Sequence, residues 1–487
     1  MIRGLTLLCG LVAALCGCAS PDSTDVEPAA EVEPSEALDP LPEQLDLQIA
    51  QYLDQYGRYW PTFRFHGVVL VARGEDIAVH RAFGSADLTA DVPNTTTTRF
   101  AVGTLSAQLV AAAVMKLAAD GRLSLSDTVR AHLPNFPNGS RITVRQLLAH
   151  TSGIPNFTET PQFEASKSTA PPLSTLIGSF SSYALEHEPG EEVTPSNSNY
   201  VLLSAIIERA AGVSFESYIA EAILSPLEMN ATEFGQTEAA QATGLQFNER
   251  EHLDSVRNVH PAAFGAAGGY LSQADDLFRF HRALLADSLL SRDSRDEMMG
   301  LSEDGGYAWV TQDWQGRRLS GWPGLIDGQN SSVLLAPDDE TVVIVLANTE
   351  VVSAGQVAQD VMTMIYGGDA PKHPEAREVP EPLVKQASAA GHYVITRGTE
   401  RMIEAVDPEQ LDNLTEIDVV VHDEHLSLVI PSHGRKRMHP KASGQWFFKD
   451  LPRTTARYVQ RTDGSGRLYL QQPGGAELAF IKQPRPV

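Results

Sequence analysis

The sequence predicts a mixed α/β fold, in which an antiparallel sheet is flanked by helices and a small all-β domain follows. Apolar hairpin patterns occur near residues 67–79 and again near 332–346, with long helical patterns between them. Strands at both ends of a region with helices between them favour one antiparallel sheet covered by helices. Beyond residue 382, short strand-like runs recur at regular spacing, which is typical of a small β domain.

Composition limits the classes of function. The chain has 487 residues, of which 42% are apolar and 20% charged, and its formal net charge is −25. Its length allows two or three domains with a large buried core. The acidic balance argues against a nucleic-acid partner, because neutralising phosphates requires clustered Lys and Arg. All three cysteines lie at or before Cys18, so we expect no disulfide, no thiolate nucleophile and no Cys-type zinc site in the folded part. We expect no metal or cofactor.

The first eighteen residues predict export and lipid anchoring. Arg3 precedes an apolar run over residues 5–15, which is too short to span a bilayer as a stable helix and suits a secretory signal. The run ends in Leu-Cys-Gly-Cys, which resembles the bacterial lipobox and implies that Cys18 carries lipid. Ala19 follows instead of Asp, which favours an outer-membrane anchor facing the periplasm. The alternative is an ordinary signal peptide cut near Ala19.

The predicted domain boundaries follow changes in composition. After the signal at 1–18, residues 19–43 form an acidic, proline-rich tether that cannot bury enough apolar surface to fold. The main α/β domain is expected over 44–370. Four prolines mark a linker over 371–382, and the C-terminal β domain covers 383–487.

The individual elements follow from periodicity. Apolar residues recur at helical spacing where the main domain begins: Leu45, Ile49, Leu53 and Tyr56. Helices are predicted over 106–119, ending at Asp120-Gly121, and over 200–211, ending at Gly212. Hairpins are predicted at 67–72 with 77–79, and at 332–335 with 342–346. Five strands are predicted in the β domain: 393–395, 418–421, 426–430, 445–448 and 468–470.

Several motifs resemble one enzyme family. Residues 65–74, 142–155 (with His-Thr-Ser-Gly at 150–153), 196–200 and 267–272 stand in the order found in serine β-lactamases and penicillin-binding proteins, especially the class C and esterase-like branch. The resemblance covers roughly residues 44–366 and implies a β-lactamase/transpeptidase-like fold. The C-terminal β domain is similar to an appendage often found behind such domains.

The resemblance also implies where catalysis would occur. The family uses Ser-x-x-Lys, Tyr-x-Asn and Lys- or His-x-Gly, which meet in one cleft and supply the nucleophile, the general base, a proton shuttle and positive charge. In this sequence the first motif falls on Thr104 and Ala107. The second falls on Pro195 and Asn197, and the third on Trp322 and Gly324.

Each substitution removes a chemical group. Ala107 has no lone pair to accept a proton, Pro195 has no phenol, and Trp322 brings a neutral, bulky indole in place of a cation. Nowhere in the sequence does Ser or Thr stand three residues before Lys. We therefore expect no catalytic residues and a non-catalytic protein with a binding or scaffolding role in the cell envelope.

Other interpretations remain open at this stage. Thr104 acting with an unidentified base, such as His150 or His187, would give an esterase, β-lactamase or D,D-peptidase-like enzyme. His150 is otherwise a satisfied core histidine. The basic stretch 433–441 is either a solvated hairpin or a site for an anionic envelope polymer. The expected partners are a cell-wall or envelope component and the membrane, reached through the lipid. The oligomeric state is open, and the β domain is a further candidate for carrying the function.

The tryptophans near the third motif also allow two interpretations. Trp309, Trp314 and Trp322 either form an aromatic binding surface or pack in the core, and core packing is the default.

Overall fold

A computed structural model describes most of the main domain and the strands of the C-terminal part. The described residues are 40–59, 64–235, 241–247, 253–256, 259–302 and 306–370, followed by 391–395, 416–422, 425–430, 434–440, 446–448, 451–460, 466–471 and 477–483. The predicted signal, Cys18 and nearly all of the tether lie outside these residues, as does the 371–382 linker. The chain divides into two compact units, one holding Arg64–Ala370 and the other Pro371–Val487.

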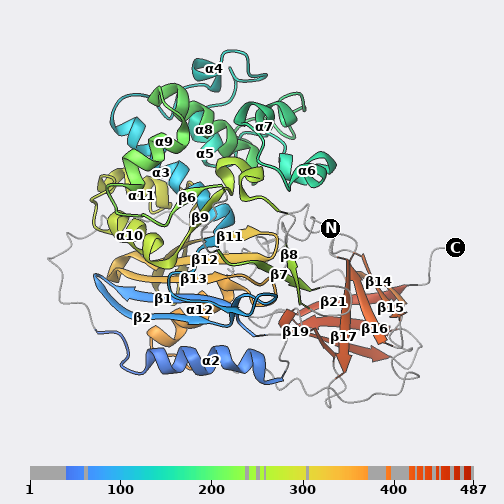
Figure 1. The fold of residues 1–487 in the computed structure, drawn as a ribbon. Coiled ribbons are helices and arrows are strands. Elements are labelled where there is room, and N and C mark those ends of the chain that lie inside the picture. The colour runs from blue at the N-terminus through green and yellow to red at the C-terminus, as the bar shows by residue number, and fades with distance from the viewer. Residues whose placement is uncertain are drawn as a thin grey trace, which may run out of the picture. The chain divides into compact units, whose positions relative to one another are not determined.

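A six-stranded antiparallel sheet forms the centre of the larger unit (Figure 1). Its order is β10 (Val310–Trp314), β11 (Arg317–Ile326), β12 (Gln329–Ala336), β13 (Thr341–Ala347), β1 (Gly67–Arg73) and β2 (Asp76–Phe83). β1 pairs with β13 in the middle, so the two ends of the domain close one sheet. Both predicted hairpins are confirmed as β1–β2 and β12–β13. Every residue of β13 is buried, as expected of a strand with helices on both faces.

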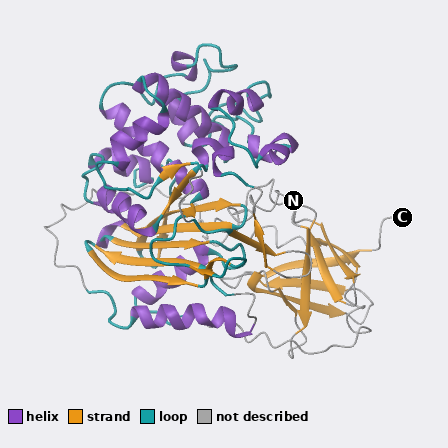
Figure 2. Ribbon diagram, viewed as in Figure 1, coloured by secondary structure: helices purple, strands orange, loops and turns teal. Residues whose placement is uncertain are grey.

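Helices cover this sheet (Figure 2). α10 (Ala274–Leu285) packs against β1 and β13, and α12 (Ala354–Ile365) packs against β12 and β13. α2 (Leu45–Tyr59) is attached to α12 by a buried hydrogen bond that the Tyr52 hydroxyl donates to Asp360. α3 (Ser106–Ala119) has the predicted bounds. α8 (Asn197–Ala211) begins three residues before its predicted start at residue 200 and ends at Gly212, whose φ is 74°.

The remaining helices of this unit are short. They are α4 (Val129–His132), α5 (Val144–Leu148), α6 (Pro161–Ser166), α7 (Leu173–Phe180), α9 (Phe215–Ile219), α11 (Arg292–Met299), η2 (Gly103–Leu105), η3 (Phe157–Glu159), η4 (Ala220–Leu224), η5 (Pro261–Ala267) and η6 (Pro337–Asp339). Three small sheets complete it: β3 (Ser85–Asp87) with β4 (Val92–Pro93); β5 (Phe100–Ala101), β9 (Tyr270–Ser272) and β6 (Glu233–Phe234); and β7 (Gly244–Phe247) with β8 (Leu253–Val256).

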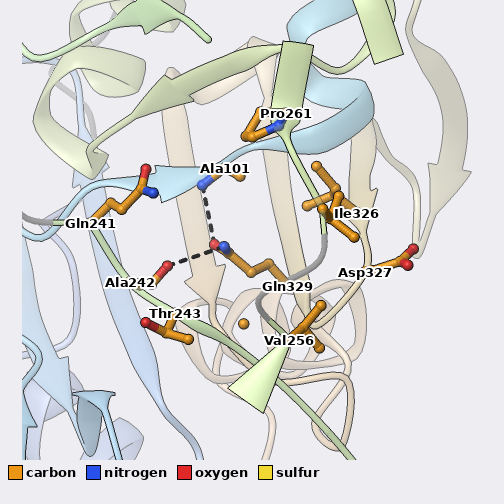
Figure 3. Close-up of a pocket in the computed structure, with 11 residues that line it drawn as sticks. Ala101, Gln241, Ala242, Thr243, Val256, Pro261, Ile326, Asp327 and Gln329 are labelled. Atoms are coloured by element: carbon orange, nitrogen blue, oxygen red, sulfur yellow. Dashed lines mark hydrogen bonds between the residues drawn. The ribbon is translucent and has the colours of Figure 1, made fainter. Parts of the chain in front are cut away.

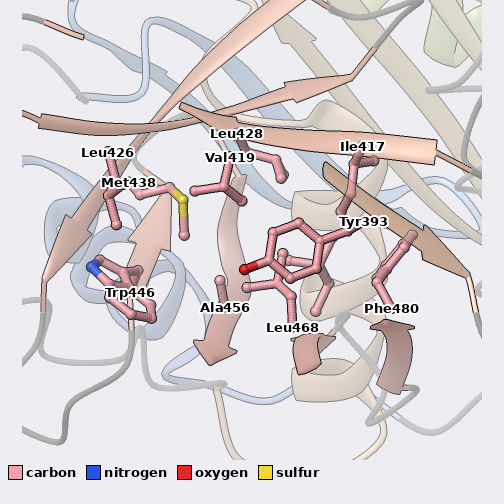
Figure 4. Close-up of a cluster of buried hydrophobic side chains, with 11 residues drawn as sticks. Tyr393, Ile417, Val419, Leu426, Leu428, Met438, Trp446, Ala456, Leu468 and Phe480 are labelled. Atoms are coloured by element: carbon pink, nitrogen blue, oxygen red, sulfur yellow. The ribbon is translucent and has the colours of Figure 1, made fainter. Parts of the chain in front are cut away.

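The smaller unit contains a closed antiparallel barrel. Its strands are β14 (Gly391–Ile395), β15 (Glu416–His422), β16 (His425–Ile430), β17 (Gly434–Pro440), β18 (Trp446–Phe448), β19 (Leu451–Gln460), β20 (Gly466–Gln471) and β21 (Glu477–Gln483). Buried side chains fill the interior, among them Tyr393, Met438, Trp446 and Phe480 (Figure 4). The five predicted strands are confirmed. The basic stretch is not a hairpin: β17 is one strand between β16 and β18.

No helix within the described ranges is both long and apolar enough to cross a membrane.

Candidate functional site

Thr104, the predicted nucleophile position, lies in the turn that leads into α3. Thr104 is the middle residue of η2, directly after β5. Gly103 has a φ of 56°, a conformation that favours glycine. A Cβ at Gly103 would lie 2.4 Å from the carbonyl oxygen of Leu325, so the turn is packed directly on the backbone of β11.

A second glycine lets β11 approach the same turn. A Cβ at Gly324 would lie 2.0 Å from the carbonyl oxygen of Val102 and 2.1 Å from Ser331 Oγ. Ser331 Oγ in turn donates a hydrogen bond to the Val102 carbonyl at 3.0 Å. The first and third motif segments therefore lie together, held by contacts that only glycine permits.

The Thr104 hydroxyl is engaged by the backbone. Its Oγ1 donates to the carbonyl oxygen of Pro323 at 2.9 Å, and within the described part of the chain it has no histidine or carboxylate partner. Ala107 is buried in the first turns of α3. Among the described residues, the Thr104 hydroxyl is therefore hydrogen-bonded to a backbone carbonyl and not to a side chain that could act as a base.

The second motif segment lies at the start of α8. Pro195 is exposed, and Ser196 is the N-cap residue. The Asn197 side-chain Nδ2 donates to Thr158 Oγ1 at 3.0 Å, and its backbone N–H donates to Asn156 Oδ1 at 3.2 Å. The amide that the family resemblance assigns to substrate binding is thus bonded to the η3 region.

His150 links the second and third segments. Its Nδ1 accepts a hydrogen bond from the Ser196 backbone N–H at 3.1 Å and lies 3.2 Å from Asn199 Nδ2. Its ring is stacked on that of Trp322, with centroids 6.4 Å apart and planes 6° from parallel. Burial lowers the pKa of His150 to about 4. The residue is therefore a neutral acceptor that positions α8, in agreement with its interpretation as a core histidine.

The other histidine considered as a base is engaged elsewhere. His187 Nδ1 lies 3.0 Å from the carbonyl oxygen of Glu188, its neighbour in the chain. Neither His150 nor His187 hydrogen-bonds to Thr104.

Trp322 stands where the family resemblance predicts a cation. Its Nε1–H is buried and has no hydrogen-bond partner among the described residues. Trp309 is 2% exposed and packs edge-on against His281. Trp314, at the far end of β10, lies against Tyr366. These indoles do not make one continuous aromatic surface, and core packing accounts for Trp309.

Nearby phenols do not replace the missing tyrosine of the second motif. Tyr200 lies against His150, with ring centroids 5.2 Å apart, and its hydroxyl donates to the Leu148 carbonyl at 3.1 Å. Burial raises the pKa of Tyr200. The Tyr307 hydroxyl donates to Glu297 at 2.8 Å. Tyr200 stays protonated, and neither hydroxyl is the hydrogen-bond partner of Thr104.

Lys167 is a cation close to the turn after β11, but it is not a base. It forms ion pairs with Asp327 and Glu164. Burial works against its charge, but the hydrogen bonds to these two carboxylates outweigh burial and raise the pKa of Lys167. In the described ranges no group of three or more His, Cys, Asp or Glu residues is arranged to hold a metal ion.

A cavity of about 190 Å³ lies beside the end of β11 (Figure 3). It is lined by Ala101, Gln241, Ala242, Thr243, Gly244, Val256, Val259, Pro261, Ile326, Asp327 and Gln329. None of the six motif positions lines it, although Ala101 and Ile326 are within three residues of Thr104 and Gly324 along the chain. Sequence reasoning missed this site because its lining comes from separate segments without a shared motif.

The fold and the meeting of these segments define the class of serine β-lactamases and transpeptidases. The sequence profile of the Beta-lactamase family matches residues 50–362, and the chain belongs to this family. The predicted family and fold are confirmed.

Relatives and solved structures agree with this assignment. Penicillin-binding protein 4* of Bacillus subtilis is 27% identical over 456 residues, which are 85% of this chain and 95% of that protein. The putative penicillin-binding protein PbpX of the same organism is 28% identical, covering 62% of this chain and 74% of its own. An octameric penicillin-binding protein homologue from Pyrococcus abyssi has a TM-score of 0.61 at 21% identity, over 90% of this chain and 99% of that one. A D-amino acid amidase from Ochrobactrum anthropi has a TM-score of 0.58 at 20% identity, and the match covers 66% of this chain and 99% of the amidase. At these identities the structures establish a shared fold.

The glycine contact between β11 and the Thr104 turn gives a first prediction. Gly324→Ala should lower the free energy of unfolding by about 1–3 kcal/mol, because its Cβ would overlap Val102 and Ser331. Gly178→Ala is the matched control: it lies in α7 with nothing within 4 Å of its Cβ, and should leave stability unchanged or raise it by up to about 1 kcal/mol. Denaturant unfolding of both variants measures the free energy of unfolding. Equal changes in the two variants would contradict a close contact at Gly324.

His150 gives a second prediction, on pH. An unperturbed histidine titrates near pH 6.5, so between that pH and about 4 the unfolded chain binds a proton at this residue while the folded chain does not. The free energy of unfolding should therefore fall as the pH drops, by about 2 kcal/mol between pH 7 and pH 5 from this residue. His150→Gln should remove that share. Urea titrations of the wild type and of His150→Gln at pH 7 and pH 5 test this. If the free energy of unfolding falls by the same amount in both proteins, the prediction is wrong.

Proposed function

We propose that this protein is a non-catalytic member of the Beta-lactamase family with a binding or scaffolding role in the cell envelope. The observation that carries the proposal is the hydrogen bond from the Thr104 hydroxyl to the Pro323 carbonyl, since no side chain among the described residues accepts a hydrogen bond from Thr104. A threonine at its ordinary pKa does not attack a carbonyl at a useful rate without a base.

The groups missing at the other predicted motif positions support the same proposal. The general base position is the Ala107 methyl group, the phenol position is Pro195, and the cation position is Trp322. In a proton-transfer mechanism the groups act as a unit, so losing several of them leaves no partial pathway. The Thr104 hydroxyl, the Asn197 amide and the backbone amides near Leu325 remain, and Asn197 is already bonded to Thr158.

Anchoring at the membrane is a separate part of the proposal. The lipobox-like sequence ending at Cys18 and the acidic tether after it support a lipoprotein held at the outer membrane and facing the periplasm.

Activity-based labelling tests the catalytic part. The full-length chain in detergent should not react with a fluorescent fluorophosphonate or a fluorescent penicillin, because Thr104 has no base. Gel fluorescence measures labelling, and a thermal melt confirms that the protein is folded. Labelling that disappears in Thr104→Ala would overturn the proposal and establish a serine-hydrolase-type reaction, in line with the relatives named as penicillin-binding proteins and amidases.

A reconstructed site supplies the positive control. The variant Thr104→Ser, Ala107→Lys, Pro195→Tyr and Trp322→His restores the groups that the family motifs contain. Because backbone contacts position this site, the variant should gain labelling by the penicillin probe that the parent lacks. The same variant with Ser at 104 replaced by Ala should lose it.

The anchoring part has its own test. In a Gram-negative host, metabolic labelling with an alkyne fatty acid should mark the wild-type chain, and fractionation should place it with the outer membrane. Cys18→Ala should abolish both the label and the membrane association, because the thiol is the attachment point. If Cys18→Ala leaves the chain labelled and bound to the membrane, the lipoprotein assignment is wrong.

A further inference from the structure

A buried histidine at the contact between α3 and α10 lies between two oxygen atoms. His281 on α10 is fully buried. Its Nδ1 lies 2.6 Å from the Leu277 carbonyl oxygen, and its Nε2 lies 3.0 Å from Gln108 Oε1 on α3. A carbonyl oxygen can only accept a hydrogen bond, so Nδ1 has to carry a proton. A neutral imidazole then has no proton left for Nε2.

The orientation of the Gln108 amide is set from its other end. Gln108 is buried, and its Nε2 donates to the Ala308 carbonyl oxygen at 3.3 Å. A reversed amide could donate to a neutral His281, but its oxygen would then face the Ala308 carbonyl, which cannot donate. The other neutral tautomer of His281 places a lone pair against the Leu277 carbonyl. Each neutral arrangement therefore brings two acceptors together, and only the imidazolium fits all three contacts.

The Ala308 carbonyl belongs to a strained turn. Ala308 is buried and has a φ of 59°, a left-handed conformation that is unfavourable for alanine. A residue of this kind keeps its conformation only where its surroundings hold it. Backbone hydrogen bonds join Gly306 and Tyr307 to α11. The Gln108 amide supplies a contact at Ala308 itself.

This turn leads directly into the sheet beside the candidate site. β10 begins two residues after Ala308 and pairs with β11, on which Trp322 lies. Gln108 follows Ala107 near the start of α3. A change at the buried histidine therefore reaches both the strand edge and the helix that carry predicted motif positions.

The charged groups on the elements around His281 are engaged away from its ring. Burial lowers the pKa of His281 to about 4, and the hydrogen bond to the Leu277 carbonyl opposes this shift. Among the described residues its hydrogen-bond partners are Leu277 and Gln108. The charged or titratable groups nearby are, on α10, Asp275 with His80, Asp276 with Arg279, and Arg282 with Glu75 and Glu340; on α11, Arg292 and Arg295 with Asp287, and Asp296 with Arg295; beside Ala308, Tyr307 with Arg145 and Glu297; on β1, Arg73 with Asp339; and on α3, Lys116 in the last turn. The protonation of His281 therefore follows the pH of the solvent.

We propose that His281, Gln108 and the Ala308 carbonyl form a proton-operated switch. With a proton on both ring nitrogens, His281 donates to Leu277 and to Gln108. The Gln108 amide then holds the strained Ala308 turn, and the structure corresponds to this state. When one proton leaves to solvent, the amide reverses and donates to the ring, so the turn loses its side-chain partner and can leave the strained conformation. The switch does not depend on whether Thr104 is reactive.

The ring titration of His281 tests the switch. Nitrogen NMR of the full-length chain in detergent, with histidine labelled at its ring nitrogens, reports how many protons each ring carries, and His281→Gln identifies the His281 signals. From neutral pH downward the folded wild type should go from one ring proton to two, with a midpoint at about pH 4. Circular dichroism shows the pH range in which the chain is folded. Because such a group is about a tenth protonated one pH unit above its midpoint, the shift is measurable before any acid unfolding.

Two substitutions at residue 108 should move this midpoint in opposite directions. Gln108→Glu places a carboxylate against the ring and should raise the midpoint by about 1–3 pH units, because the opposite charge favours the imidazolium. Gln108→Met removes the acceptor and should lower the midpoint. His150→Gln, which removes another buried histidine, is the matched control and should leave the His281 midpoint unchanged.

A glycine substitution tests the link to the strained turn. Ala308→Gly makes the left-handed conformation easier to adopt, so the protonated state, which holds this conformation, costs less. The His281 midpoint should therefore rise, by up to about one pH unit. Gln315→Gly is the matched control, since Gln315 has a φ of 54° in the turn between β10 and β11, and it should leave the midpoint unchanged. Thermal melts confirm that each variant is folded.

The proposal is overturned if His281 shows no proton uptake while the wild type is folded, if Gln108→Met titrates at the wild-type midpoint, or if Ala308→Gly and Gln315→Gly share one midpoint. Midpoints that fall in the order Gln108→Glu, wild type, Gln108→Met, with Ala308→Gly above Gln315→Gly, support it. These outcomes are independent of the labelling experiment, which reports on Thr104 and not on His281.

Discussion

The close contact between the β11 backbone and the Thr104 turn is the constraint on which the rest of the site depends. Gly103 and Gly324 allow two backbones to approach where any Cβ would collide with a carbonyl oxygen. This contact fixes the start of α3 against the sheet. It also sets where neighbouring residues of β11 lie: Trp322 against His150 on one side of Gly324, and Ile326 and Asp327 at the cavity on the other.

Because this constraint lies in the backbone, it does not depend on the side chains at the predicted motif positions. Ala107 suits a buried helix, where it costs little conformational entropy. Pro195 stands outside α8, where it interrupts no helical hydrogen bond. Trp322 gains a stacking contact with His150, at the cost of an indole N–H that has no partner among the described residues. Each of these residues is compatible with local packing, and none of them has the chemical group that the family motif has at the corresponding predicted position. Fold and chemistry are separable here.

Sequence patterns predicted the elements that are buried through a continuous or regularly spaced run of apolar residues. α3 has its predicted bounds because its apolar run is continuous. α8 begins earlier than predicted because its first turn is polar by sequence, yet Ser198 and Asn199 are fully buried by tertiary hydrogen bonds to Pro155 and Ser152. β17 was not predicted as a strand, because the residues from Gly434 to Arg437 show no apolar alternation. The motif positions were inferred from the family resemblance, and the structure brings the segments carrying Thr104 and Gly324 together. The cavity could not be predicted, since nothing in the sequence links Gln241 or Val256 to Asp327.

The residues at the predicted motif positions also bear on the charge around Thr104. In the family motifs two cationic positions flank the nucleophile, an arrangement that stabilises negative charge developing on a substrate. Here one of those positions is the methyl group of Ala107 and the other is the neutral indole of Trp322. The nearby cation Lys167 is neutralised by Asp327 and Glu164. Asp327, the carboxylate at the end of β11, is therefore already paired within the chain. The side chains at the predicted motif positions supply no positive charge, so any stabilisation of negative charge beside Thr104 would have to come from backbone amides.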